Sequence, residues 1–191
     1  MIVFTGTGRS GTLWLAKCFH ARHEYKMGLF FVSQWPEFKN DWSEFEDRLS
    51  AMQRHLRNVD ITSFRDSSNM YVHFLDALYE MDNNIKIVLC IRNLENFIRS
   101  AIKKRWHTKK YQGYHHRPVN GWDNWEDRRK MEWLFNFRNG KALARMSRVP
   151  KENKMICHLE EVSKDISPIE NFLGIKADEK YASIIVNRGK R

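Results

Sequence analysis

Two patterns of apolar residues recur along the chain. Short, nearly continuous apolar runs are typical of strands that a parallel sheet buries on both faces, and the clearest of them spans 85–91. Weaker runs predict strands at 1–5, 60–64 and 154–159. The run at 28–32 fits either a short strand or a loop that packs on the core.

Longer segments with apolar residues at helical spacing separate these runs. They predict helices directly after residue 12, at 35–58 as one helix or two, and at 70–80, 95–104, 125–146 and 169–175. Strands that alternate with helices in this way are typical of open α/β folds. We therefore expect a three-layer α/β/α fold of the P-loop NTPase type, with a mostly parallel sheet of four or five strands.

A glycine-rich loop, 6–12 (GTGRSGT), lies between the first strand and the first helix. Glycines let consecutive backbone N–H groups point inward, which suits the loop to an anion. Gly6 and Gly11 have the spacing of a nucleotide triphosphatase loop, but Thr12 and Leu13 stand where its lysine and its magnesium-binding hydroxyl would be. A magnesium–ATP site is therefore disfavoured, and the cation of this loop is Arg9.

A second candidate anion site follows the strongest strand. Arg92 comes at the carboxyl end of that strand, and Ser100 follows eight residues later. This spacing places the serine two turns into the next helix, so both side chains can reach one anionic group over the edge of the sheet.

Both segments resemble motifs of the sulfotransferases that use 3′-phosphoadenosine 5′-phosphosulfate (PAPS), in particular the bacterial type. Residues 8–14 are similar to the family's 5′-phosphosulfate loop, and 86–100 are similar to its 3′-phosphate motif. The resemblance spans 2–175 with sparse matches. It implies PAPS as the donor, with Gly8, Arg9, Ser10, Gly11, Thr12 and Leu13 at the phosphosulfate and Arg92 and Ser100 at the 3′-phosphate. A basic C-terminal segment covers that phosphate in relatives, which adds Arg188.

The resemblance also implies a reaction, the in-line transfer of a sulfuryl group to an acceptor hydroxyl or amine. Arg9 would stabilise the charge that develops on the leaving phosphate, so no metal is expected. The pair His23-Glu24 and the turn that holds Asp66 resemble elements near the family's reaction centre. As the base that takes the acceptor's proton we rank Glu24 first, His23 second and Asp66 third.

This sequence departs from the family's pattern at two places. Asn93-Leu94 follows Arg92 where the family usually has Asp-Pro, so we expect a different turn between strand and helix. Leu13 replaces a second threonine of the loop, which removes a hydroxyl from the phosphosulfate site.

The composition fits a folded intracellular protein. At 191 residues, with 42% hydrophobic residues, we expect 1–191 to form a single domain. The three cysteines lie in apolar stretches, and no apolar run approaches the ~18 residues of a membrane span. These features predict buried free thiols, no membrane partner and a cytoplasmic location.

The net charge of +10 favours anionic partners, and a basic, aromatic segment adds to it. We interpret 105–125 as an acceptor loop or lid. Its interleaved cationic and aromatic residues also fit single-stranded nucleic acid, which makes a basic nucleic-acid-binding module one alternative. A catalytically inactive, sulfotransferase-like nucleotide-binding protein is another. The identity of the acceptor and the oligomeric state do not follow from the sequence.

Overall fold

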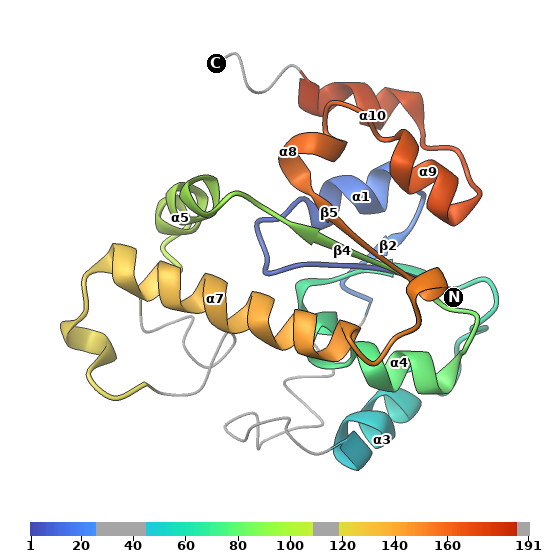
Figure 1. Ribbon diagram of the computed structural model, residues 1–191, viewed down its shortest axis with the longest axis horizontal. Helices are drawn as coiled ribbons and strands as arrows, with labels where there is room; N and C mark the ends of the chain where they lie inside the picture. The colour runs from blue at the N-terminus through green and yellow to red at the C-terminus, as the bar shows by residue number, and fades with distance from the viewer. Residues whose placement is uncertain (26–44, 109–118, 187–191) are drawn as a thin grey trace.

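A five-stranded, all-parallel sheet forms the centre of the protein (Figure 1). The computed structural model describes residues 1–25, 45–108 and 119–186. The strand order is β2-β3-β1-β4-β5, with β1 in the middle. The strands are β1 (Ile2–Thr5), β2 (Arg22–His23), β3 (Arg65–Ser67), β4 (Lys86–Ile91) and β5 (Lys154–His158).

Helices cover both faces of the sheet, which makes the expected three layers (Figure 1). One face carries α1 (Thr12–Cys18), α8 (Leu159–Val162), α9 (Ser167–Leu173) and α10 (Glu179–Val186). The other carries α3 (Phe45–His55), the 3-10 helix η1 (Asn69–His73), α4 (Leu75–Met81) and the end of α7 (Asp127–Met146). The helix α5 (Leu94–Lys103) packs against α7, and the short 3-10 helices η3 (Trp122–Asn124) and η4 (Lys151–Asn153) precede α7 and β5.

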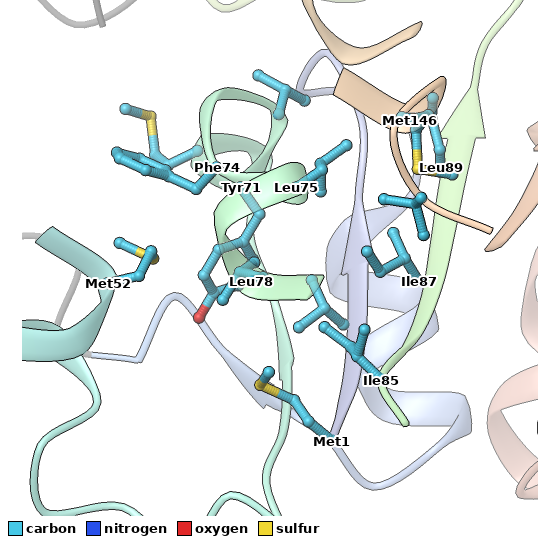
Figure 2. Packing of buried hydrophobic residues seen from close by; sticks show 14 of the residues in the cluster. Met1, Met52, Tyr71, Phe74, Leu75, Leu78, Ile85, Ile87, Leu89 and Met146 are labelled. Carbon is cyan, nitrogen blue, oxygen red and sulfur yellow. The ribbon is translucent and has the colours of Figure 1, made fainter. Parts of the chain in front are cut away.

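The strand β4 contributes buried side chains to both layers of the core, as its apolar run predicts. Ile87 and Leu89 pack into the cluster with α4 and α7, which Figure 2 shows. Val88 and Cys90 face the opposite cluster, with α1 and β5. Side chains of a strand alternate between the two faces of a sheet, so a strand buried on both faces needs apolar residues at every position.

Two expectations for the strands that precede β4 are wrong. Residues 61–63 form a turn, because Asp60 accepts hydrogen bonds from the N–H and hydroxyl of Thr62 and from the hydroxyl of Ser63. The strand is instead β3, which contains Asp66 and which the sequence predicted to be a turn. The two-residue β2 was not predicted at all.

The helix predictions hold with changes at their ends. The expected helix 70–80 divides into η1 and α4, and α10 was not predicted. Gly174 closes α9 in a left-handed conformation, at φ 69°. The predicted strand or loop at 28–32 lies outside the described residues, as does the start of the predicted helix 35–58.

The three cysteines are free and buried, as predicted. Burial raises the pKa of the Cys18 thiol to about 12, and the nearby Asp178 adds to the shift, so this thiol is protonated at neutral pH. No helix among the described residues is long and apolar enough to cross a membrane.

A side-chain hydrogen bond ties α10 to α1: the indole Nε1 of Trp14 donates to the carbonyl of Tyr181 over 3.0 Å. We expect Trp14→Phe to lower the free energy of unfolding by about 1 kcal/mol, because phenylalanine keeps an aromatic ring but loses the donor. Urea denaturation measures the loss. Tyr181→Phe is the control, because the acceptor is a backbone carbonyl. Equal stability of Trp14→Phe and the wild type would contradict the prediction.

Candidate functional site

The glycine-rich loop after β1 is held tightly between its neighbours. Gly8 and Gly11 have φ angles of 84° and 88°, which disfavour any side chain. A Cβ at Gly8 would lie 2.4 Å from the Trp106 ring, and one at Gly11 would lie 2.6 Å from Cδ1 of Leu159. The loop therefore keeps its curled backbone only with glycine at both positions.

Buried side chains support the loop from inside the protein. Arg138 of α7 is fully buried and donates from Nη1 to the carbonyl of Thr7 over 2.9 Å. Burial lowers its pKa to about 10, which still leaves it charged at neutral pH. Ser67 donates to the carbonyl of Thr12 over 2.7 Å. Sequence reasoning missed Arg138, because an arginine within a helical pattern is ordinarily a solvated residue.

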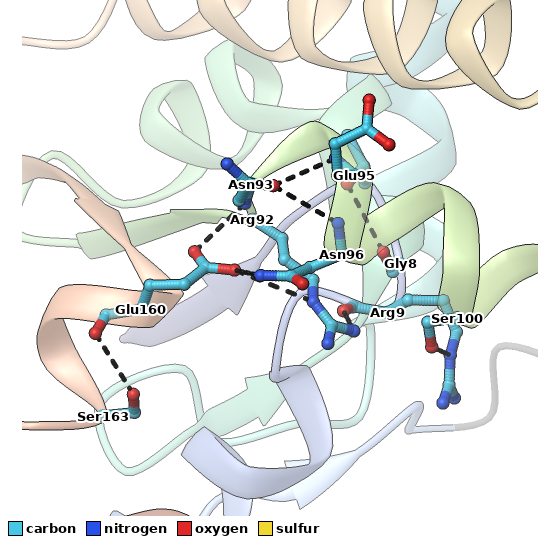
Figure 3. A network of polar contacts seen from close by, with 10 residues as sticks. Gly8, Arg9, Arg92, Asn93, Glu95, Asn96, Ser100, Glu160 and Ser163 are labelled. Atoms are coloured by element: carbon cyan, nitrogen blue, oxygen red, sulfur yellow. Dashed lines mark hydrogen bonds and ion pairs between the residues drawn. The ribbon is translucent and has the colours of Figure 1, made fainter. Parts of the chain in front are cut away.

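Arg9, Arg92 and Ser100 come together at the carboxyl edge of the sheet, as Figure 3 shows. Nε of Arg9 donates to the hydroxyl of Ser100 over 2.9 Å, and Nη1 of Arg92 donates to the carbonyl of Arg9 over 2.9 Å. Arg9 itself has φ 54°, which is uncommon for a residue with a side chain. The guanidinium of the loop thus lies against the residue that the sequence placed in the second anion site.

A basic pocket of about 380 Å³ lies at this meeting point. It is lined by Arg9, Arg92, Asn96, Arg99, Ser100, Lys103 and Lys104. Burial lowers the pKa of Arg92; Glu160 opposes this shift, whereas the charges of Arg9 and Arg99 add to it. Five cationic side chains in one pocket repel one another, so an anion with two charges would relieve that repulsion.

A larger cleft of about 570 Å³ extends over the loop. Arg9 and Arg92 line it as well as the basic pocket, and His23 and Glu24 line it at and just after β2. Its other lining residues include Gly8, Gly11, Thr12, Leu13, Trp14, Lys17, Asn69, Trp106, Leu159, Tyr181 and Ile184. The cleft therefore brings two candidate bases to the same space as the loop.

Apolar groups form part of this cleft. Leu13 is 53% exposed and Ile184 is 42% exposed, and both lie among the lining residues with the ring of Tyr181. Leu13 thus gives the cleft an apolar surface, in agreement with the loss of a hydroxyl that the sequence predicted at this position. α10 contributes residues that the sequence did not indicate.

Asp66 does not line the cleft. It is fully buried in β3, where it accepts a hydrogen bond from the Tyr71 hydroxyl over 2.6 Å and one from the N–H of Tyr25 over 3.2 Å. Burial raises its pKa, although these hydrogen bonds act in the opposite direction. The neighbouring Ser68 caps η1 by accepting from the N–H of Met70.

The loop itself offers a test of whether it fits a phosphate. Ser10 is fully buried, and its hydroxyl has no hydrogen-bond partner within the described residues. A buried polar group without a partner costs about 1–3 kcal/mol, which a ligand that bonds to it would recover. The α1 helix that follows has no side-chain cap on its first turn. The residues present therefore fit an anionic group, and Arg188 lies outside the described residues.

The predicted acceptor loop 105–125 is described at its two ends only. Near its start Trp106 packs over Gly8, and near its end Trp122 is buried against the α5 and α7 helices. The described parts of the chain contain no group of three or more His, Cys, Asp or Glu side chains placed to hold a metal ion.

Comparisons with known proteins support the fold. No family model matches the chain, and no curated protein sequence matches it. Among solved structures, the chain is similar to a sulfotransferase domain from the curacin biosynthetic pathway, with a TM-score of 0.61 and 15% identity over 95% of this chain and 76% of that one. It is also similar to a sulfotransferase from Alicyclobacillus acidocaldarius, with a TM-score of 0.53 and 13% identity over 93% and 83%. The chain therefore has the fold found in these sulfotransferases.

Proposed function

We propose that residues 1–191 form a single sulfotransferase domain that transfers a sulfuryl group from PAPS to a hydroxyl or amine. The observation that carries the proposal is the joining of two anion-binding parts by Arg9, whose backbone belongs to the glycine-rich loop and whose side chain bonds to Ser100. A donor with phosphates at both its 3′ and 5′ positions needs two such parts close together. The fold of the similar sulfotransferases supports the same interpretation.

Each part of the site has its own task in donor binding. The loop 8–13 would hold the 5′-phosphosulfate with its backbone N–H groups and with the hydroxyls of Ser10 and Thr12. Arg92 and Ser100 would hold the 3′-phosphate in the basic pocket. Arg99, Lys103 and Lys104 line the same pocket and would raise the local concentration of anions.

PAPS supplies a sulfuryl group on a good leaving group, the 5′-phosphate of adenosine 3′,5′-bisphosphate. Its S–O bond to that phosphate breaks as a bond from sulfur to the acceptor's oxygen or nitrogen forms. The guanidinium of Arg9 would stabilise the negative charge that develops on the leaving phosphate. Arginine stays protonated throughout, so its contribution is electrostatic.

The acceptor's proton needs a base on the other side of the loop. Glu24 and His23 are both exposed and line the cleft at and just after β2, at the opposite end of the sheet from β5. We therefore expect the donor to lie over β1 and β4 and the acceptor over β2 and β3. We rank Glu24 as the base and His23 as its alternative. Asp66 acts instead as a support, since it binds the N–H of Tyr25 next to Glu24.

The first test is calorimetric titration of the protein with adenosine 3′,5′-bisphosphate, AMP and magnesium–ATP. We expect a clear preference for the bisphosphate, and we expect Arg92→Ala to weaken its binding about thirtyfold, because one charged hydrogen-bonding partner of the 3′-phosphate is lost. Arg57→Ala is the matched control, since it removes the same charge from an exposed residue that lines neither the cleft nor the basic pocket.

Equal binding of all three ligands would reject the PAPS proposal. Steeply salt-dependent binding of oligonucleotides, with no preference for the bisphosphate, would favour a nucleic-acid-binding module instead. Selective binding of the bisphosphate without sulfuryl transfer to any acceptor would identify an inactive nucleotide-binding protein.

A further inference from the structure

The carboxylate of Glu160 in α8 contacts three residues, Arg92, Asn93 and Asn96, of which Arg92 and Asn96 line the basic pocket (Figure 3). Its Oε2 accepts a hydrogen bond from the N–H of Asn93 over 3.0 Å, and its Oε1 accepts one from Nδ2 of Asn96 over 2.9 Å. Oε1 also lies 3.9 Å from Nε of Arg92, as an ion pair. One carboxylate thus binds the end of β4 and the first turn of α5.

We propose that Glu160 is a positioning residue that gives the site its selectivity for a 3′-phosphate, by holding the guanidinium of Arg92 in place. This inference rests on the proposed function of the pocket. The contacts of Glu160 within the protein connect a structural role in this turn to ligand recognition.

The guanidinium of Arg92 is held from two sides. Its Nε is buried and makes no hydrogen bond within the described residues, but it lies in ion-pair distance of the Glu160 carboxylate; its Nη1 donates to the carbonyl of Arg9. Its third nitrogen, Nη2, makes no hydrogen bond to any described residue, and the side chain keeps 26% of its surface exposed. Because Nε is enclosed, Nη2 is the nitrogen left for a ligand, and the ion pair and the Nη1 hydrogen bond set the orientation of the guanidinium before the ligand arrives.

The carboxyl group of Glu160 is ionised while it contacts Arg92. Burial alone would raise its pKa, but hydrogen bonds from Asn96 and Asn93 and the charge of Arg92 outweigh burial and lower it. Asn93 is also the cap of α5, because its side chain accepts from the N–H groups of Glu95 and Asn96. The carboxylate therefore fixes the turn that connects Arg92 to the helix of Ser100.

The negative charge of Glu160 and its role in orienting Arg92 predict opposite effects of its removal on ligand binding. As an anion, Glu160 reduces the positive potential of a pocket that contains five cationic side chains, so its removal would strengthen the binding of any phosphate. As a positioning residue, it orients Arg92, so its removal would weaken only those ligands that carry a 3′-phosphate. A purely structural role would weaken all ligands alike.

The test is Glu160→Gln, titrated with adenosine 3′,5′-bisphosphate and with AMP. An amide has nearly the same shape, but it offers one acceptor oxygen where the carboxylate offers two and it carries no charge. We expect the Kd of the bisphosphate to rise about tenfold and that of AMP to change by less than about twofold. Glu161→Gln is the matched control, because it removes the neighbouring charge of α8 and is expected to change neither Kd.

Each other outcome has a definite meaning. A Glu160→Gln variant that keeps the wild type's ratio of the two Kd values overturns the positioning role, whether both ligands bind more tightly or less tightly. A wild type that does not prefer the bisphosphate to AMP rejects the proposed function itself, before Glu160 is considered. Thermal melts of both variants separate a loss of folding from a loss of selectivity.

Discussion

Gly6→Ala is expected to lower the free energy of unfolding by about 3 kcal/mol, at the upper end of the range for overpacking in a close-packed interior. A Cβ at Gly6 would lie 2.0 Å from Oγ of Ser10 and 2.3 Å from the carbonyl oxygen of Cys90. The first is a short, fully buried side chain and the second belongs to the backbone of β4, so neither can move aside cheaply. The glycine-rich loop must separate from the sheet to make room.

Denaturation in urea measures this loss, and Gly140→Ala is the matched control. Gly140 is exposed in the interior of α7 and a Cβ there would meet nothing within 4 Å, so the same substitution is expected to raise stability by about 0.5–1 kcal/mol. Adding Ser10→Ala to Gly6→Ala should recover only part of the loss, because the Cys90 carbonyl remains in the way. Similar stability of the two glycine variants would show that the loop tolerates a Cβ at Gly6.

Arg9→Ala is expected to lower the rate of sulfuryl transfer about 100-fold at saturating donor, equivalent to about 3 kcal/mol of transition-state stabilisation. The guanidinium acts on charge that appears only as the bond to the leaving phosphate breaks. Its loss should therefore reduce kcat more than it reduces affinity for adenosine 3′,5′-bisphosphate. Conversion of PAPS to the bisphosphate, followed with an acceptor that supports turnover, measures kcat.

Two comparisons make the Arg9 prediction sharper. Arg9→Lys keeps the charge and should retain more of the rate than Arg9→Ala, although it loses the planar group that bonds to Ser100. Arg57→Ala is expected to leave the rate unchanged, as it is expected to leave the binding unchanged. If Arg9→Ala lost affinity for the bisphosphate and kept kcat, the residue would serve donor binding and the proposed electrostatic role would be wrong.

The parts of the fold that the sequence predicted well are those where burial alone decides the pattern. The run at 85–91 is apolar at nearly every position because both faces of β4 are covered. A short, continuous apolar run of this kind is typical of a strand that is buried on both faces. The eight-residue spacing from Arg92 to Ser100 also predicted that the two residues lie close together, because the geometry of a strand end followed by a regular helix is fixed.

The parts that were missed depend on partners far away in the sequence. β3 consists of Arg65, Asp66 and Ser67, a polar stretch that is stable in the sheet because Tyr25, Tyr71 and Thr12 satisfy its buried groups. No local pattern could indicate those bonds. β2 is a two-residue edge strand with exposed side chains, so it leaves no apolar signal in the sequence.

In the candidate site, too, the sequence predicted the residues that depend on local spacing and missed the contacts between distant segments. The loop and Arg92 follow from local spacing, whereas the contacts of Arg138 and Glu160 were missed, because their partners lie 131 and 67 residues away. The placement of Asp66 away from the cleft likewise follows from Tyr71, whose hydroxyl binds the carboxylate inside the core.

Because α10 docks on α1, the order of synthesis on the ribosome decides when the cleft is complete. The hydrogen bond from Trp14 joins residues 167 positions apart, and Ile184 of the same helix lines the cleft. The central strand β1 is translated early, yet it remains unpaired until β3 and β4 have emerged, because they are its neighbours in the sheet. Contacts between such distant segments form late in folding. A nascent chain that already contains the whole glycine-rich loop therefore still lacks one wall of the cleft above it until α10 has been synthesised and has docked.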